Sequence, residues 1–190
     1  MIESRIRETI GNLENLAGDD KTIAAISEAA DMITGAVKSG NKLMICGNGG
    51  SAADAQHMAG EYLCRFYKDR APLPAIALST DSSVITSISN NYSYSEIFSR
   101  QVEAIGKRGD VLLGISTSGS SKNVLKAFEA ARRFHIDTIL ITGALEKDIA
   151  LLSDITVKAP SIDTSRIQEI HLFIEHIICE IIEDRTYGEN

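Results

Sequence analysis

The sequence predicts a single α/β domain in which helices flank a parallel sheet. Five short runs rich in β-branched and apolar residues follow residue 41, and stretches of helical composition separate them. Such alternation is typical of a parallel sheet, because parallel neighbours need a crossover connection that is usually a helix. A chain of 190 residues, 44% of them hydrophobic, is long enough to bury one substantial core. We therefore expect one domain over residues 1–190.

The first forty residues have the periodicity of two amphipathic helices. Apolar side chains recur at helical spacing over residues 2–13 and 23–37, and Gly18-Asp19-Asp20 interrupts the pattern. Both helices lie outside the alternating strand pattern. We expect residues 1–40 to form an N-terminal helical segment used in oligomerisation, ahead of an α/β core and a C-terminal helix over residues 41–190.

The elements of the core follow in order. Short apolar and β-branched runs predict strands at residues 42–46, 75–78, 111–115, 138–142 and 155–158. The segments between them and the end of the chain have helical composition, which predicts helices at residues 51–67, 82–89, 97–105, 121–134, 145–152 and 165–183.

The last predicted helix is apolar on more of its circumference than one core-facing stripe requires. The alternative is a helix buried within its own monomer. We expect part of its surface to contact another subunit, because the N-terminal helices also lie outside the sheet pattern.

Two turns rich in glycine and serine lie where a strand meets a helix. They are Gly47-Asn48-Gly49-Gly50-Ser51 and Ser116-Thr117-Ser118-Gly119-Ser120-Ser121. Either stretch alone also fits an ordinary cap or tight turn. However, the first amides of a helix and its dipole favour an anion, and ligands of open α/β sheets bind beyond the carboxyl ends of the strands. Two such turns predict a phosphorylated ligand. Neither turn matches the dinucleotide or P-loop patterns, so a nucleotide is not the first choice.

Composition and charge exclude several classes of function. A formal net charge of −7 disfavours a general nucleic-acid or anionic-membrane surface. Cys46, Cys64 and Cys179 are odd in number and lack C-x-x-C spacing, as expected for reduced thiols rather than for a disulfide framework or a zinc ribbon. The start of the chain is charged and lacks an apolar signal core, and no apolar run reaches membrane-spanning length. We expect a cytoplasmic protein.

Polar residues of two predicted helices are candidates for chemistry. His57 and Glu61 are one i, i+4 step apart, so they project from the same face of the helix that follows the first turn. They would share a metal or a substrate, or they would form an ordinary solvated edge.

The last predicted helix offers two alternative sets. These are Gln168 with His176, two turns apart, and His171 with Glu175. Spacing leaves the choice open. Histidines with a carboxylate fit zinc, and glutamine is a weaker oxygen ligand. Ser165-Arg166-Ile167-Gln168 also matches a capping box, which would use Gln168 at its own helix start.

Three segments taken together resemble the phosphoheptose isomerases of the sugar isomerase (SIS) domain superfamily. They are residues 46–57, which include the first turn, residues 114–119, which include the second, and Arg166-Ile167-Gln168-Glu169-Ile170-His171. The similarity covers nearly the whole chain. It implies a five-stranded parallel sheet of flavodoxin-like type and a homotetramer with active sites at subunit boundaries. The implied reaction interconverts sedoheptulose 7-phosphate and glycero-manno-heptose 7-phosphate, which opens the bacterial route to nucleotide-activated heptose for lipopolysaccharide or other surface glycans.

The same resemblance implies roles for individual residues. One zinc ion per subunit would be bound by His57, Glu61, Gln168 and His176. Glu61 and Gln168 would also face the substrate. The first turn would contact the sugar phosphate through Asn48, Gly49 and Gly50, with Ser51 nearby, and the second would hold the phosphate through Ser116, Thr117, Ser118 and Ser121. Asn90 and Asn91 fall at a substrate-binding position where the family is expected to have Asn-Asp, so Asn91 keeps hydrogen bonding and lacks the charge.

Our mechanistic hypothesis assigns Glu61 and His176 as the acid and base pair of a ketose–aldose isomerisation through an enediol. Which of the two removes the first proton is left open. Two other functions are alternatives: a non-catalytic relative that binds the bacterial replication initiator, and a regulatory sugar-phosphate sensor. Neither has a use for the Glu61 and His176 pair, so the presence of both residues favours the enzyme.

Overall fold

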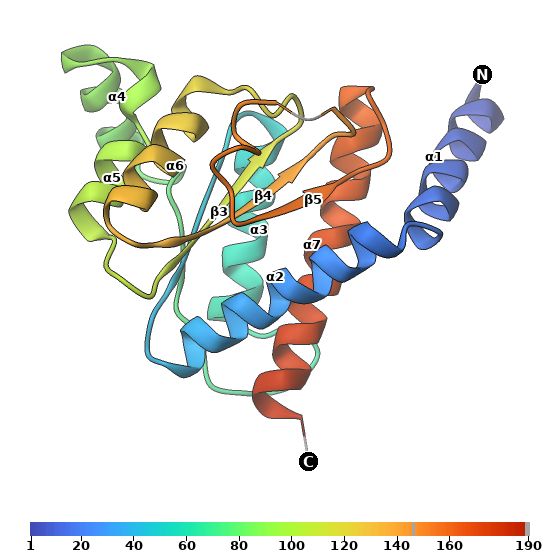
Figure 1. The fold of residues 1–190 in the computed structure, drawn as a ribbon, viewed down its shortest axis with the longest axis horizontal. Helices are drawn as coiled ribbons and strands as arrows, with labels where there is room; N and C mark the ends of the chain where they lie inside the picture. The colour runs from blue at the N-terminus through green and yellow to red at the C-terminus, as the bar shows by residue number, and fades with distance from the viewer. Residues whose placement is uncertain (146, 189–190) are drawn as a thin grey trace.

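The computed structural model describes residues 1–145 and 147–188, which form a sheet covered by helices on both faces (Figure 1). The elements in chain order are α1 (Ile2–Ala17), α2 (Asp20–Lys38), β1 (Leu43–Gly47), α3 (Gly50–Leu63), β2 (Ala75–Ala77), α4 (Ser82–Asn91), the 3-10 helix η1 (Tyr94–Glu96), α5 (Ser99–Ile105), β3 (Val111–Ser116), α6 (Lys122–Arg133), β4 (Asp137–Thr142), β5 (Ile155–Lys158) and α7 (Thr164–Tyr187).

The five strands lie in the order β2-β1-β3-β4-β5, and all neighbours are parallel. This confirms the flavodoxin-like sheet. The order reverses between β1 and β3, where Gly47 pairs with Ile115 at the carboxyl ends of the two strands. Ligands of open α/β sheets bind at such a reversal point. The two glycine- and serine-rich turns therefore leave the sheet side by side.

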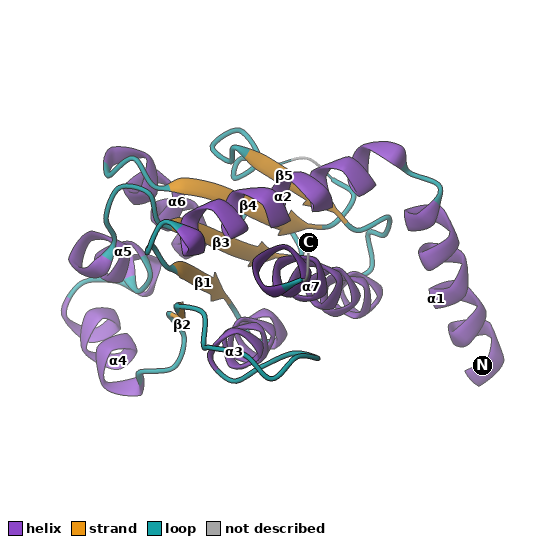
Figure 2. Cartoon of the chain, turned by 90° about the horizontal axis from the view of Figure 1, so that it is seen from below, coloured by secondary structure: helices purple, strands orange, loops and turns teal. Residues whose placement is uncertain are grey.

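Alternate residues of the central strands supply two separate cores. Leu43, Ile45 and Leu113 point to the face covered by α2, α3 and α7, whereas Met44 and Leu112 point to the face covered by α5 and α6 (Figure 2). All five side chains are fully buried. Strands covered on both faces read as continuous apolar runs, which is why the strands were visible in the sequence.

The N-terminal helices differ in their relation to the core. α2 buries Ile26, Ala29 and Ile33 against the sheet and α7, so it belongs to the core rather than to a separate N-terminal segment. The break between the helices lies where it was expected, and Asp19 caps α2 by accepting a hydrogen bond from Lys21 N at 3.1 Å. Only α1 projects away from the sheet (Figure 1).

Some predicted boundaries were wrong. The helix expected at residues 51–67 ends at Leu63, and no helix forms over the described part of 145–152, of which residue 146 lies outside the described residues. Residues 148–152 form turns instead, because Ile149 is fully buried and its amide donates to Gly119 O at 3.3 Å, which ties the segment to the second turn. No helix among the described residues combines the length and apolar character needed to cross a bilayer.

Candidate active site

The first glycine-rich turn is tight because neighbouring groups occupy the space of the missing side chains. A Cβ at Gly47 would lie 2.6 Å from Ser51 O, and one at Gly50 would lie 2.5 Å from Gln168 Nε2. Gly49 has φ +59°, a conformation that favours glycine. The turn thus starts α3 directly beyond β1 and lets the Gln168 side chain of α7 lie against its backbone.

Two histidines from different helices meet farther along α3, two helical turns beyond Gly50. His57 of α3 and His176 of α7 face each other with their Nε2 atoms 2.8 Å apart, although 119 positions separate them. Glu61 Oε1 lies 3.7 Å from His57 Nε2, as expected for residues one turn apart. The ring of Phe66 packs 5.8 Å from the His176 ring. An imidazole pair and a carboxylate therefore share one face between α3 and α7.

His171 and Glu175 point from α7 into the core and are 0% and 1% exposed. Burial lowers the pKa of His171 to about 4, against a smaller opposing effect of the Thr142 backbone. Burial, together with the nearby Asp54 carboxylate, raises the pKa of Glu175 to about 9. Both groups are therefore neutral near pH 7. Of the two sets that spacing left open, Gln168 lies against Gly50 and His176 faces His57, whereas His171 and Glu175 are buried in the core.

The capping-box alternative for Gln168 is wrong. α7 is capped by Asp163, whose carboxylate accepts from the amides of Ser165 and Arg166 at 3.0 and 3.2 Å. Ser165 consequently lies inside the first turn of the helix, because a carboxylate two residues upstream already binds the free amides. Gln168 is left free to reach Gly50.

The second turn gathers hydroxyls at the start of α6. Ser116 Oγ and Ser121 Oγ are 3.0 Å apart, and Ser118 Oγ accepts from Ser120 N at 3.3 Å. Ser121 is the N-cap residue of α6, and Gly119 has φ +64°. Because the first amides of a helix lack helical acceptors, this turn combines free N–H groups with hydroxyls, the donors that a phosphate takes.

Asn90 and Asn91 come four and three residues before Tyr94, which hydrogen-bonds to Asn48 of the first turn. They are the last residues of α4 and are exposed, and Asn90 Nδ2 reaches Asn91 Oδ1 at 3.5 Å. α4 lies at the far edge of the molecule from α7 (Figure 1).

Three residues that sequence reasoning missed support the site. Arg70 donates to Glu61 O at 2.8 Å from behind α3. Asn123 and Tyr94 both hydrogen-bond to Asn48 of the first turn. Asn123 stands two residues after the second turn, but nothing in local spacing connects it with a residue 75 positions away.

The donor set fits zinc. Two imidazole nitrogens, a carboxylate and a glutamine oxygen are ligand types that Zn²⁺ accepts. Among the described residues, no three His, Cys, Asp or Glu side chains form a complete cage, and His57 and His176 are a pair with Glu61 beside it. The 2.8 Å between the two nitrogens is shorter than the roughly 3.3 Å between two ligands of a tetrahedral zinc with bonds of about 2.0–2.1 Å, so a small outward shift of the rings suffices.

Comparison with known proteins decides the family. The family profile of the SIS domain matches residues 13–143. A relative from Clostridium acetobutylicum named phosphoheptose isomerase is 47% identical over 99% of this chain and 96% of its own length. The chain belongs to the phosphoheptose isomerase family of SIS-domain proteins. This confirms the resemblance inferred from the three segments.

Solved structures of this family extend the match to the whole fold. A phosphoheptose isomerase from Francisella tularensis superposes with a TM-score of 0.92 at 37% identity, covering 96% of each chain. The phosphoheptose isomerase of Neisseria gonorrhoeae gives a TM-score of 0.91 at 36% identity, covering 96% of this chain and 97% of the other. The family fold therefore accounts for nearly the whole chain.

Proposed function

We propose that this member of the phosphoheptose isomerase family converts D-sedoheptulose 7-phosphate into D-glycero-D-manno-heptose 7-phosphate, the first step toward nucleotide-activated heptose for surface glycans. Relatives and solved structures with that name match it over nearly their full length. The observation that carries the proposal is that Glu61, His57 and His176 meet between α3 and α7, while Gln168 of the same α7 lies against the first of two turns that leave the sheet side by side. The amides and hydroxyls of the turns suit a phosphate, and the carboxylate and imidazoles between α3 and α7 suit proton transfer.

The reaction moves a carbonyl between neighbouring carbons, so one proton leaves the carbon beside the carbonyl and one returns to the other carbon. Glu61 and His176 act as the acid and base pair, because a carboxylate and an imidazole can exchange protons near neutral pH. The hydroxyls and amides of residues 116–121 hold the phosphate, and Asn48, Gly49 and Gly50 contact the sugar phosphate beside them. His57, Glu61, Gln168 and His176 would hold one zinc ion per subunit, which when bound polarises oxygens on the reacting carbons.

An isomerase assay with sedoheptulose 7-phosphate tests the proposal. The wild type is expected to form the aldose, and Glu61→Gln and His176→Gln are each expected to lower turnover by about two to four powers of ten. Circular dichroism of both variants controls for folding. Full activity of both folded variants would contradict the assignment of Glu61 and His176 as the acid and base pair. Absence of wild-type turnover, with and without added zinc, would favour a binding or sensing role instead.

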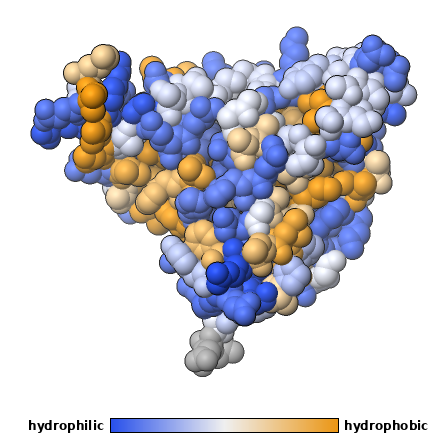
Figure 3. Space-filling model, turned by 180° about the vertical axis from the view of Figure 1, so that it is seen from behind, coloured by the Kyte–Doolittle hydropathy of each residue, from blue (hydrophilic) through white to orange (hydrophobic). Residues whose placement is uncertain are grey.

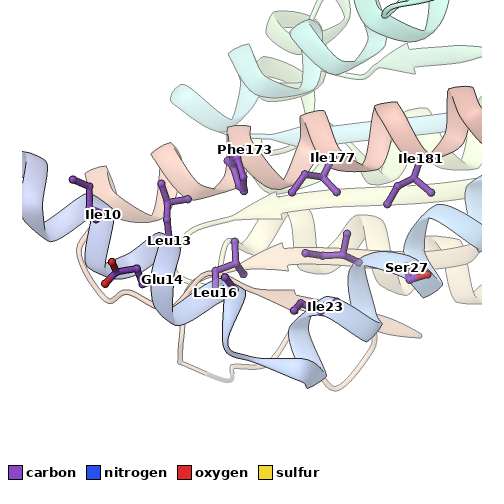
Figure 4. Close-up of a pocket in the computed structure, with 11 residues that line it drawn as sticks. Ile10, Leu13, Glu14, Leu16, Ile23, Ser27, Phe173, Ile177 and Ile181 are labelled. Carbon is purple, nitrogen blue, oxygen red and sulfur yellow. The ribbon is translucent and has the colours of Figure 1, made fainter.

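We further propose that the active enzyme is a homotetramer. α1, α2 and α7 enclose an apolar groove of about 720 Å³ lined by Ile10, Leu13, Ile23, Phe173, Ile177 and Ile181 among others (Figure 4). Ile10 and Phe173 remain 47% exposed. α1 itself carries exposed Ile2 and Ile6, and apolar atoms gather over it on the rear face (Figure 3). The apolar face of α1 in one copy can cover the apolar groove of a second copy, so the two features complement each other between subunits.

A further inference from the structure

A network of hydrogen bonds joins the first turn of the site to the start of α6, just after the second turn. It begins at Asn123, a side chain only 3% exposed, whose Oδ1 accepts from Val124 N at 3.0 Å. A backbone N–H is always a donor, so the Asn123 oxygen must face it. This removes the usual ambiguity between the two ends of an amide and fixes where Asn123 Nδ2 points.

The fixed orientation of Asn123 also determines that of Asn48. Asn123 Nδ2 donates to Asn48 Oδ1 at 2.8 Å, and Asn48 Nδ2 donates back to Asn123 Oδ1 at 2.9 Å. Tyr94 OH donates to the same Asn48 Oδ1 at 2.9 Å. The Asn48 oxygen therefore already accepts two hydrogen bonds, its full capacity, and only one hydrogen of Asn48 Nδ2 is left.

Tyr94 is held in place for this contact although its side chain is 56% exposed. It belongs to η1, and Glu96 of the same short helix pairs with Lys126 of α6. Glu96 also accepts from Ser99 Oγ at 2.9 Å. The tyrosine hydroxyl thus reaches the first turn from a segment anchored on α6.

We propose that Asn123 and Tyr94 are positioning residues which make Asn48 a donor-only contact for the substrate. This rests on the proposed function, in which Asn48 contacts the sugar phosphate. A donor-only amide donates a hydrogen bond to a carbonyl, hydroxyl or phosphate oxygen. It cannot bind a group that only donates, such as an ammonium. The polarity of one amide in the first turn is therefore set by a buried asparagine in the first turn of helix α6, two residues after Ser121.

Steady-state kinetics on the zinc-loaded enzyme with sedoheptulose 7-phosphate tests this. Asn123→Asp keeps the shape and the acceptor oxygen but replaces the donor NH2 with a second oxygen, so two oxygens lie face to face whichever way Asn48 turns, and kcat/KM is expected to fall about tenfold or more. Tyr94→Phe removes one partly solvated hydrogen bond, so KM is expected to rise about threefold with little change in kcat. Tyr92→Phe is the matched control: Tyr92 is 62% exposed and packs on Arg100, and its kinetics should equal those of the wild type.

A double-mutant cycle separates positioning from general support. If Tyr94 acts through Asn48, Tyr94→Phe has no further effect in an Asn48→Ala background. An undiminished Tyr94→Phe effect in that background, or wild-type kcat/KM in both Tyr94→Phe and Asn123→Asp, would overturn the proposal. A wild type that does not convert sedoheptulose 7-phosphate would instead overturn the proposed function, and the ligand contact of Asn48 with it.

Discussion

Arg70 and Glu183 form an ion pair, with Nε and Oε1 2.8 Å apart, in which the side chains are only 4% and 2% exposed. Glu183 also accepts from the amides of Phe66, Tyr67 and Lys68, and Arg70 donates to the Glu61 carbonyl. Burial alone would raise the pKa of Glu183, but these hydrogen bonds lower it below its ordinary value. The pair therefore secures the end of α3 that carries Glu61.

Removing one member of this pair is expected to be strongly destabilising. Glu183→Gln leaves the Arg70 charge buried without its partner, which costs about 3–5 kcal/mol. Urea unfolding followed by circular dichroism measures the loss. The matched control is Lys68→Met, which breaks the neighbouring ion pair of Lys68 with Asp184, 40% and 62% exposed, and is expected to change the free energy of unfolding by less than about 1 kcal/mol. Equal effects of the two changes would contradict the special role of the buried pair.

His171 predicts a dependence of stability on pH. Its pKa is lowered to about 4 in the folded chain by burial, from an ordinary value of 6.5. Between pH 4 and pH 6.5 the unfolded chain binds a proton at His171 and the folded chain does not. Protonation of His171 therefore favours unfolding, so its contribution to the free energy of unfolding is fully present above pH 6.5 and is lost as pH falls toward 4. At pH 5 the loss is about 2 kcal/mol. In His171→Gln the slope of unfolding free energy against pH should become shallower over this range, and a slope equal to that of the wild type would contradict this account.

Gly50→Ala is expected to impair the site without unfolding the chain. The new Cβ would lie 2.5 Å from Gln168 Nε2, the end of a flexible side chain, so Gln168 moves away from the turn. We expect kcat/KM to fall about tenfold or more, measured with the isomerase assay, because a misplaced contact weakens transition-state binding. Gly60→Ala is the control on the same helix: nothing lies within 4 Å of its Cβ, and it should raise stability by about 0.5–1 kcal/mol with unchanged kinetics. Wild-type activity of Gly50→Ala would argue against a role for Gln168.

Zinc is expected to stabilise the protein as well as to support turnover. A ligand that binds only the folded chain adds about 2.7 kcal/mol at one hundred times its dissociation constant. Addition of zinc to chelator-treated protein should therefore raise the melting temperature, measured by calorimetry, and restore activity. His57→Ala removes one side of the imidazole pair and should abolish both responses. A melting temperature that does not respond to zinc would contradict the assigned ligand set.

The apolar surface of α1 predicts the assembly. Ile6 and Ile10 are 55% and 47% exposed in the single chain, so replacing both with Asp should leave the fold of the monomer intact while weakening contacts between copies. Light scattering should give about four times 20.6 kDa for the wild type and a smaller mass for the variant. Leu151→Asp, at a position 75% exposed outside this surface, should keep the wild-type mass. A wild type with the mass of one chain would refute the tetramer.

Elements whose signal is local were readable in the sequence. The strands appear as short apolar runs because both faces of the sheet are covered, and the glycine-rich turns appear because only glycine fits their backbone. Predictions from local sequence were wrong where a contact with another part of the chain, or a different capping residue, determined the structure. Residues 148–152 are tied to Gly119 and form turns, and Asp163 caps α7 in place of Ser165.

The sequence by itself determined the fold class, the two turns and the small set of polar residues that carry the chemistry, since spacing along a helix or strand is a property of the local backbone. Only the tertiary structure decided which face of α7 meets α3. His171 and His176 lie on one helix whose apolar surface is wider than one core-facing stripe, so periodicity does not separate them. Packing buries the first and brings the second within 2.8 Å of His57. The Arg70 and Glu183 pair and the Asn48 and Asn123 pair are likewise products of packing, because each joins residues more than seventy positions apart and leaves no periodic trace in the sequence.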